Sequence, residues 1–149
     1  MERTLIIVKP DGVQRGLIGA ILTRLERRGL RFAAIKMIQM TPELAARHYA
    51  EHKEKKFYPG LIQFITSGPV VAAVVEGEGA IDIVRKTMGV TNPAKAEPGT
   101  IRADFGLETG RNLVHGSDGP ESAAREVALF FAEEEILSYG RAIDGWIHE

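Results

Sequence analysis

The sequence predicts an α/β (α+β) sandwich of the ferredoxin-like type, with βαββαβ connectivity, an antiparallel sheet and extra helices. Three observations lead to this prediction. Short apolar segments have the composition of strands, segments with an apolar stripe at helical spacing separate them, and the strands are too few for a doubly wound sheet. With 149 residues and an ordinary globular composition, the chain is expected to form one domain, residues 1–149.

The first part of the chain alternates strand and helix signals. Thr4–Val8 is apolar and β-branched, as in a strand buried on both faces, and the turn residues Lys9–Gly12 are expected to end it. Leu17–Arg28 carries one apolar stripe and predicts a helix, which Gly29 ends. Arg31–Ile38 is the second predicted strand.

Two helices and the strongest strand signal follow. Thr41 is a good N-cap with proline next to it, which predicts a helix over residues 42–52. After a charged break, Phe57–Ile65 predicts a short helix that Pro59-Gly60 interrupts. Val70–Val75 is an uninterrupted apolar run and predicts a buried strand.

The next part contains a long segment without a clear pattern. Ala80–Met88 predicts a helix, but residues 89–111 are rich in glycine and proline and show little periodicity. A loop of this length inside a compact domain is usually functional or disordered. Leu113–His115 is expected to form a short strand after this loop.

The last predicted helix covers Pro120–Glu135. Asp118 is its expected N-cap, because Glu121 follows at the spacing of a capping box. The remaining segment, Ile136–Glu149, has no regular pattern and is expected to be an irregular tail.

Composition narrows the classes of function. The 19 basic and 20 acidic residues give a net charge of −1, which argues against a protein that coats nucleic acid but is compatible with a local anion site. The absence of cysteine rules out disulfides, thiolate nucleophiles and cysteine-based metal sites, and a cytoplasmic location is expected. No apolar run is long enough to span a membrane, so no membrane association is expected.

Two patterns imitate catalytic motifs, and an ordinary structural explanation is favoured for both. Gly77–Asp82 resembles a dinucleotide-binding turn, but Asp82 stands where close packing of helix on strand needs glycine. His48–His52 fits the zinc-binding pattern H-x-x-E-H, but basic residues flank it and no third ligand is evident. A solvated helix end is therefore expected there. A Walker phosphate-binding loop is absent from the chain.

Residues 85–126 contain most of the side chains that could perform chemistry. His115 lies between a predicted strand and a Gly-Ser-Asp turn, a place from which a ring nitrogen can face a cleft. The alternative is an ordinary histidine near a helix N-terminus, with Ser117 and Asp118 as capping residues.

Phosphoryl transfer is the chemistry that these residues favour. It requires a positioned nucleophile and compensation of negative charge, and little else from the protein. A neutral imidazole is available near neutral pH because the usual pKa of histidine is about 6.5. Tyr49 and Phe57 add a hydroxyl and a flat face, suited to a phosphate and a base. Cationic donors for phosphate oxygens are Lys9, Arg85 and Arg102.

Several motifs occur in a fixed order along the chain. The most specific is Asn112-x-x-His115-Gly116-Ser117-Asp118, and Glu126 follows it. Together the motifs resemble those of the nucleoside diphosphate kinase family, and the resemblance covers essentially the whole chain. The other matching segments are Thr4–Val13, Arg15–Leu17, His48-Tyr49, Phe57-Tyr58, Ser67–Val70, Gly89–Pro93 and Pro98–Arg102.

The resemblance implies a ping-pong phosphoryl transfer. In this family a histidine takes the γ-phosphoryl group from a nucleoside triphosphate such as ATP or GTP. It then passes the group to a nucleoside or deoxynucleoside diphosphate, which maintains the triphosphate pools. His115 matches the catalytic histidine, and Glu126 matches the glutamate that holds its ring. Ser117 and Asp118 match supporting residues of the same signature.

The resemblance also implies how nucleotides are bound. Phe57 matches the aromatic residue on which the base stacks, and stacking tolerates every base, so broad base tolerance is expected. Mg²⁺ is the expected cofactor, held by the nucleotide phosphates and by a water on Asp118, with no metal site built from the protein alone. The residues that match phosphate and ribose contacts are Lys9, Tyr49, Arg85, Thr91, Arg102 and Asn112.

Four positions depart from the family pattern without touching the transfer chemistry. Lys56 stands where many relatives have proline, which implies a looser entry to the following helix, and Val75 stands where tryptophan is common. Ala103 replaces a common glycine. Thr109 replaces an aliphatic residue that would contact the second face of the base, so a weaker contact with the base is expected.

The tail and the composition leave alternatives for assembly and function. Residues 136–149 resemble the longer C-terminus of hexameric members, so a homohexamer is expected, with a tetramer as the alternative. A nucleotide-sensing module of the same fold would need Lys9 and Arg102 but has no use for a His–Glu pair. Nucleic-acid binding is expected to be at most an incidental activity.

Overall fold

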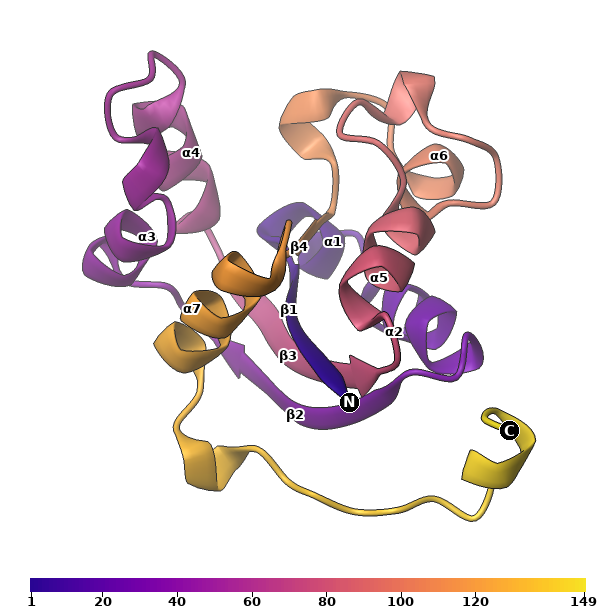
Figure 1. Cartoon of the computed structure of the whole chain (residues 1–149). Helices are drawn as coiled ribbons and strands as arrows, with labels where there is room; N and C mark the ends of the chain where they lie inside the picture. The colour runs from indigo at the N-terminus through magenta and orange to yellow at the C-terminus, as the bar shows by residue number, and fades with distance from the viewer.

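Four strands form one antiparallel sheet in the order β2-β3-β1-β4 in the computed structural model, which describes all residues from Met1 to Glu149 (Figure 1). The sheet is antiparallel throughout, as predicted for the ferredoxin-like fold. The strands are β1 (Glu2–Val8), β2 (Arg31–Ile38), β3 (Val70–Gly77) and β4 (Val114–Gly116).

Helices cover both faces of this sheet, which explains why the central strands are apolar on both sides (Figure 1). One face is covered by α2 (Ile18–Arg27) and α5 (Ala80–Met88), and the other by α3 (Pro42–His48), α4 (Tyr58–Ile65) and α7 (Pro120–Phe130). No helix is both long and apolar enough to cross a membrane.

Alternate residues of β1 enter two separate cores. Ile6 and Val8 pack with the α2 and α5 side, whereas Leu5 and Ile7 pack with the side of α3, α4 and α7. All four are at most 2% exposed. A strand places successive side chains on opposite faces, so the unbroken apolar run in β1 supplies both cores at once.

Three local predictions in the first half of the chain are wrong in detail. Lys9–Gly12 does not form a simple turn, because Pro10 starts the short helix α1 (Pro10–Gln14), a position that proline favours. Pro59 lies in the first turn of α4, where its missing N–H costs no bond, so it does not interrupt that helix. The predicted 42–52 helix ends at His48 and is followed by a 3₁₀ turn, η1 (Ala50–His52).

The segment 89–111 is also more ordered than predicted. It contains η2 (Pro93–Lys95), α6 (Ile101–Phe105) and η3 (Thr109–Arg111). The Thr100 hydroxyl accepts a hydrogen bond from the Ala103 amide at 3.2 Å and so caps α6. Helices of three to five residues are too short to show a periodic pattern, so no helix could be predicted in this segment.

The start and end of α7 differ from the prediction. Gly119, not Asp118, is the N-cap, and its amide donates to the Ser122 hydroxyl at 3.0 Å, so Ser122 replaces the expected Glu121. The helix ends at Phe130, and Phe131 is extended. Both phenylalanines are buried in the same core, which the extended backbone at Phe131 allows.

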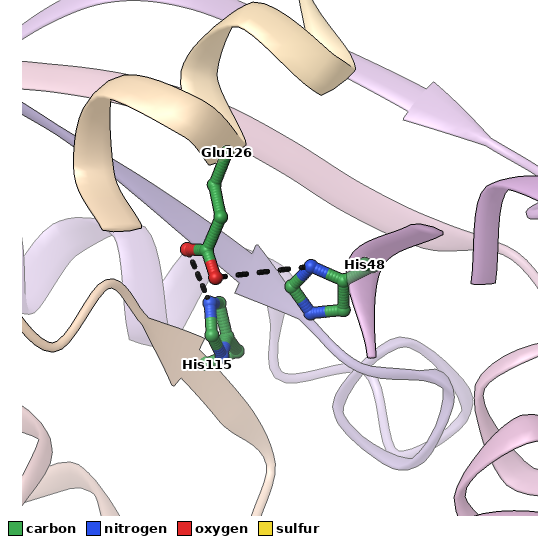
Figure 2. A group of neighbouring side chains, drawn as sticks. All are labelled: His48, His115 and Glu126. Carbon is green, nitrogen blue, oxygen red and sulfur yellow. Dashed lines mark hydrogen bonds and ion pairs between the residues drawn. The ribbon is translucent and has the colours of Figure 1, made fainter. Parts of the chain in front are cut away.

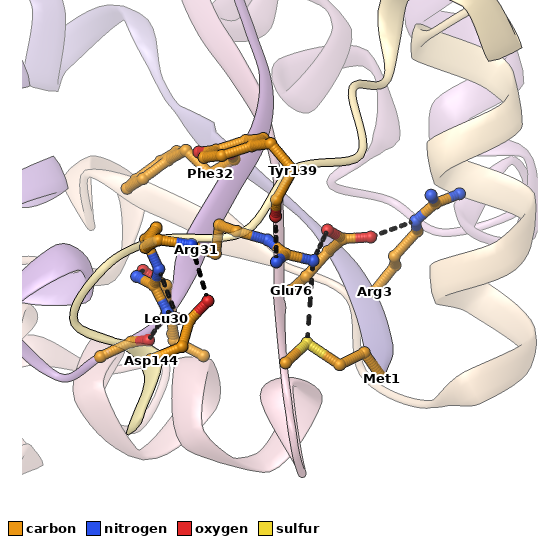
Figure 3. Close-up of polar contacts among 10 residues, drawn as sticks. Met1, Arg3, Leu30, Arg31, Phe32, Glu76, Tyr139 and Asp144 are labelled. Atoms are coloured by element: carbon orange, nitrogen blue, oxygen red, sulfur yellow. Dashed lines mark hydrogen bonds and ion pairs between the residues drawn. The ribbon is translucent and has the colours of Figure 1, made fainter. Parts of the chain in front are cut away.

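The C-terminal tail, residues 136–149, is largely irregular, as predicted, and lies across β2 (Figures 1 and 3). The Leu137 amide donates to the Ala33 carbonyl at 2.9 Å. Ala33 lies at a register shift between β2 and β3, where it has no partner in the sheet. Farther along, the Arg141 guanidinium donates to the Gly29 carbonyl at 2.9 Å. The tail therefore binds backbone carbonyls in and just before β2, the edge strand of the sheet.

Glu76 at the end of β3 joins the two strands beside it (Figure 3). Its carboxylate accepts from Arg3 Nε at 2.6 Å and from Arg31 at 2.9 Å. Burial would raise the pKa of Glu76, but the hydrogen bonds from Arg3 and Arg31 outweigh it and lower this pKa below its usual 4.5. The carboxylate thus stabilises the folded state only while it is charged.

Glu76→Gln is expected to lower the free energy of unfolding by about 1–2 kcal/mol near neutral pH, because two charge-assisted hydrogen bonds are lost. This contribution exists above the usual carboxyl pKa and disappears as the pH falls through the lowered pKa of folded Glu76. Urea unfolding of both proteins at about pH 7 and about pH 3.5 measures it. Glu134→Gln, at an exposed glutamate without a hydrogen bond or ion pair to its side chain, is the control and should change little. An equal difference at both pH values contradicts this account.

Candidate active site

Segments far apart in the chain meet around a polar cavity of about 250 Å³. The cavity lies where the loop after β1, the end of α3, helix α5 and strand β4 come together. Most of the residues predicted for the site line it: Lys9, Tyr49, Arg85, Thr91, Arg102, Asn112, His115, Asp118 and Glu126. The structure therefore brings together side chains that are up to 117 positions apart, from Lys9 to Glu126.

A larger hollow of about 800 Å³ lies elsewhere, between the start of β1 and α7. Its walls are mostly apolar and include Ala123, Val127 and Phe131. Arg3 and Glu76 also line it, but they pair with each other at 2.6 Å. The smaller polar cavity, which contains several histidines and cations, is therefore the better candidate for chemistry.

His115 and Glu126 both line the cavity, and their side chains point toward each other (Figure 2). The Nε2 atom of His115 lies 2.8 Å from Oε1 of Glu126, and the Ser117 hydroxyl donates to the same oxygen at 2.6 Å. A carboxylate accepts hydrogen bonds, so this geometry assigns the imidazole proton to Nε2. The lone pair of a neutral His115 is then on Nδ1, which makes no hydrogen bond within the protein.

Glu126 is charged despite being only 3% exposed. Burial by itself would raise the pKa of this carboxyl group. The hydrogen bonds from His115 and Ser117 and the charge interactions with His115 and His48 outweigh burial and hold the pKa at about 2. A carboxylate with this pKa can orient a neighbouring imidazole and stabilise positive charge on it.

A strained turn positions His115 in the cavity. Leu113 has φ = 75°, the one positive value outside glycine, and the Val114 amide donates to the Asn112 carbonyl at 2.8 Å across it. Asp11 holds the turn, because its carboxylate accepts from the Leu113 amide at 3.0 Å. The leucine side chain is fully buried, and this burial compensates for the strained backbone.

Gly116 allows β4 to lie close to α5. A Cβ atom at this position would lie 2.7 Å from Sδ of Met88 and 3.0 Å from Cγ1 of Val84. The Gly116 carbonyl also accepts from the Arg85 guanidinium at 3.2 Å. The glycine that follows His115 therefore brings a helix-borne cation to the edge of the cavity.

Lys9 is held in place by Asn112. Its ammonium donates to Oδ1 of Asn112 at 2.9 Å, and Nδ2 of Asn112 donates to the Thr91 carbonyl at 3.0 Å. Burial, and then the positive charge of Arg102, lower the pKa of Lys9 from 10.5 to about 8. An anion in the cavity would relieve both effects, so the site is prepared to bind negative charge.

Arg102 has a larger structural role than the sequence suggested. Its guanidinium donates to three backbone carbonyls: Asn112 at 3.2 Å, Gly89 at 2.9 Å and Val114 at 2.7 Å. A guanidinium has five N–H donors, so two remain for a ligand. Burial, and then the charge of Arg85, lower the pKa of Arg102 to about 10. This residue therefore fixes the 89–111 segment to β4 as well as adding charge to the cavity.

Two aromatic residues have different positions in the site. The Tyr49 hydroxyl makes no hydrogen bond within the protein, and burial raises the pKa of Tyr49 to about 12, so the hydroxyl stays protonated. Phe57 does not line the cavity itself; it is 54% exposed and its ring centroid lies 5.7 Å from that of His52, which does. Phe57 therefore lies at the mouth, next to solvent.

His48 is the main residue of the site that was not predicted from the sequence. The expected solvated helix end is wrong for this residue, which is 3% exposed and has its ring centroid 4.7 Å from that of His115 (Figure 2). His52, the other histidine of the H-x-x-E-H pattern, lies in η1 beside Tyr49 and Phe57. The H-x-x-E-H pattern is the sequence signal that pointed to His48. The pattern does not show, however, that its two histidines face different neighbours.

Comparison with known proteins agrees with this geometry. The model of the family described as "Nucleoside diphosphate kinase" matches residues 2–136. The chain belongs to the nucleoside diphosphate kinase family. It is 64% identical to the nucleoside diphosphate kinase of Thermomicrobium roseum over 147 residues, 99% of each chain. It is 60% identical to that of Carboxydothermus hydrogenoformans over 149 residues, the full length of both.

Solved structures show the same relationship. A halophilic nucleoside diphosphate kinase from Halobacterium salinarum, in complex with CDP, has a TM-score of 0.97 and 51% identity and covers 99% of each chain. The predicted fold and family are thereby confirmed. The protein is a nucleoside diphosphate kinase that transfers phosphate between nucleotides.

Arg102→Lys is expected to lower the free energy of unfolding by about 2 kcal/mol, because an ammonium cannot reach the three carbonyls that the guanidinium satisfies. Urea unfolding measures this change, and proteolysis should show earlier cleavage within 89–111. Arg111→Lys is the matched control, since Arg111 donates one hydrogen bond, to the adjacent Gly110 carbonyl, and an ammonium can replace its charge over the Phe64 ring. Equal stability of the two variants would show that Arg102 does not fix this segment.

Proposed function

We propose that His115 is the phosphate carrier of this kinase and that Nδ1 is the attacking atom. The observation that supports the proposal is the 2.8 Å contact between Nε2 and Glu126, which leaves the Nδ1 lone pair free on a residue that lines the same cavity as Lys9, Arg85 and Arg102. A nucleophile oriented by a charged partner is what a covalent phosphoryl transfer needs.

In the first half-reaction, Nδ1 of His115 attacks the γ-phosphorus of a nucleoside triphosphate. The bond between this phosphorus and the oxygen that bridges it to the β-phosphate breaks, and the diphosphate leaves with the bonding electrons. The imidazole of the phosphohistidine is then positively charged, and Glu126 stabilises it through the Nε2 proton. A terminal oxygen of a second diphosphate reverses these steps and restores neutral His115.

The other cavity residues compensate charge and hold the nucleotide. Lys9, Arg85 and Arg102 would oppose the charge on the transferring group, and the free Tyr49 hydroxyl would donate to it. Asn112 and Lys9 would also reach sugar hydroxyls, with Thr91 beside them. Ser117 supports Glu126 from outside the cavity lining. The Halobacterium salinarum relative was solved with CDP, and we assign the diphosphate site of this chain to the same cavity.

Mg²⁺ fits this site as a partner of the nucleotide and not of the protein. Three carboxylates line the cavity, those of Glu51, Asp118 and Glu126, and Glu126 is already bound to His115 and Ser117. Mg²⁺ prefers oxygen ligands and retains several waters, so phosphates and a water on Asp118 are the ligands that we propose. When bound, Mg²⁺ would neutralise charge on the phosphates.

We further propose that the chain acts as a single kinase domain in a cytoplasmic homohexamer. Large apolar side chains are exposed on β2 and on the tail: Met37 is 57%, Leu137 62% and Trp146 92% exposed. Residues of this kind are typical of surfaces that contact another subunit. Light scattering of the purified protein distinguishes six copies from the alternative four.

The phosphohistidine is tested by incubating the protein with γ-labelled ATP. The wild type should gain label in a bond that acid cleaves and alkali does not, and His115→Gln should gain none. His148→Gln, in the tail, is the matched control and should be labelled like the wild type. Labelling of His115→Gln at the wild-type level would assign the carrier to another residue.

Phe57→Ala is expected to raise KM for purine and pyrimidine nucleotides by a similar factor, about tenfold, because base stacking contributes about 1–3 kcal/mol and every base has a stacking face. Phe57→Trp should keep KM close to the wild-type value. Steady-state kinetics with four nucleoside diphosphates measure the effect. A loss confined to purines would mean that Phe57 recognises shape and does more than stack.

A further inference from the structure

His48 is an unusual neighbour for the proposed nucleophile. It is 3% exposed, and neither of its ring nitrogens has a hydrogen-bond partner. Its ring centroid lies 4.7 Å from that of His115 and 5.4 Å from that of Phe130. Buried polar atoms almost always have a partner, so an unpartnered pair beside a reactive site needs an explanation. The proposed transfer uses neither nitrogen.

The surroundings of His48 have the composition of a metal site (Figure 2). Nδ1 of His48 lies 3.9 Å from Oε2 of Glu126, and Nε2 of His115 lies 2.8 Å from Oε1. The three potential ligand atoms lie within 4.8 Å of one another. Tetrahedral Zn²⁺ with bonds of about 2.0–2.1 Å places its ligand atoms about 3.3 Å apart, so small side-chain movements suffice.

One proton has to move before a metal binds to this group. It is the proton on Nε2 of His115, which the contact with Glu126 assigns to that atom.

We propose that His48, His115 and Glu126 form an inhibitory site for a divalent transition metal, with Zn²⁺ as the best match. Two imidazoles and one carboxylate supply three ligands and leave the fourth tetrahedral position of the metal open. All three residues line the cavity, so a water molecule from the cavity can be the fourth ligand. The donor set disfavours Mg²⁺, which prefers oxygen ligands. The inhibitory effect rests on the proposed role of His115; the binding itself does not.

A bound metal would prevent phosphoryl transfer because it changes the tautomer of His115. The metal takes the lone pair of Nε2, so the single proton of the neutral imidazole must be on Nδ1. The proton lost from Nε2 goes to solvent, and Nδ1 gains one from solvent. Nδ1 then has no lone pair with which to attack phosphorus. The bound metal also occupies the Glu126 carboxylate, which would otherwise stabilise the phosphohistidine.

Positive charges near the proposed metal site lower its affinity for a metal ion. Arg125 lies 3.7 Å from Oε2 of Glu126, and Lys9 and Arg102 line the same cavity. These cations repel a metal ion, so the site binds more weakly than a closed structural zinc site. His52 lies outside the ligand group, although the H-x-x-E-H pattern pairs it with His48. This difference makes His52 a matched control for the proposed ligand His48.

The test is a titration of the nucleotide-free protein with Co²⁺, which replaces Zn²⁺ and has visible absorption bands in tetrahedral sites. The wild type should bind one Co²⁺ per chain with these bands, and Zn²⁺ should displace it. His48→Gln and Glu126→Gln should each weaken binding at least about tenfold. His52→Gln should leave the spectrum and the affinity unchanged.

Two further measurements make the result decisive. In the wild type, the ¹⁵N resonances of the His48 and His115 rings should shift on titration with Zn²⁺, a readout that does not depend on any variant folding. Zn²⁺ added before γ-labelled ATP should reduce labelling of the wild type and not of folded His48→Gln. Equal Co²⁺ affinity in the wild type and His48→Gln, or an equal loss in His52→Gln, would overturn the proposal. Metal binding as expected, with label on another residue, would instead overturn the role of His115.

Discussion

The contact between Glu126 and His115 is the constraint on which the site depends. It joins α7 to β4, two elements that are both in place only when the fold is complete. It also decides chemistry, because a carboxylate on Nε2 leaves the other nitrogen as the nucleophile. Ser117 donates to the same oxygen and so limits the movement of the carboxylate. One oxygen atom thus determines the orientation and the tautomer of the imidazole.

Much of the remaining structure serves to hold this pair against an anion-binding wall. Asp11 and the buried Leu113 side chain maintain the strained turn before β4, and Arg102 connects that turn to the 89–111 segment. The cations of the wall are held by backbone carbonyls or by Asn112, not by carboxylates. Their charge is therefore not neutralised by ion pairs and is available to a polyphosphate.

The sequence allowed the sheet, most helices and the cluster of site residues to be predicted. The strand signals were strong because β1 and β3 are buried on both faces, and the signature around His115 is specific. Short elements such as α6 could not be predicted, because five residues show no period. The strain at Leu113 could not be predicted either, since leucine has no preference for positive φ and only the surrounding packing enforces it.

His48 shows a different limit of sequence reasoning. Its pattern was visible, but a motif gives spacing along a helix and not the surface that the helix covers. Helix α3 ends at His48, so the two histidines lie in different elements and face different neighbours. Which of them is buried depends on contacts with Phe130 and His115, which come from the other end of the chain. Such contacts are a property of the folded molecule.

The contact of the tail with Ala33 has a consequence for how the sheet can grow. The edge strands of a sheet offer free N–H and C=O groups to any passing strand, which is a common route to aggregation. At one edge, β4 is only three residues long. At the other, the chain's own C-terminus binds the Phe32 and Ala33 carbonyls of β2. A foreign strand can therefore extend the sheet only beyond Ala33, and proteolytic loss of the tail would uncover the whole edge.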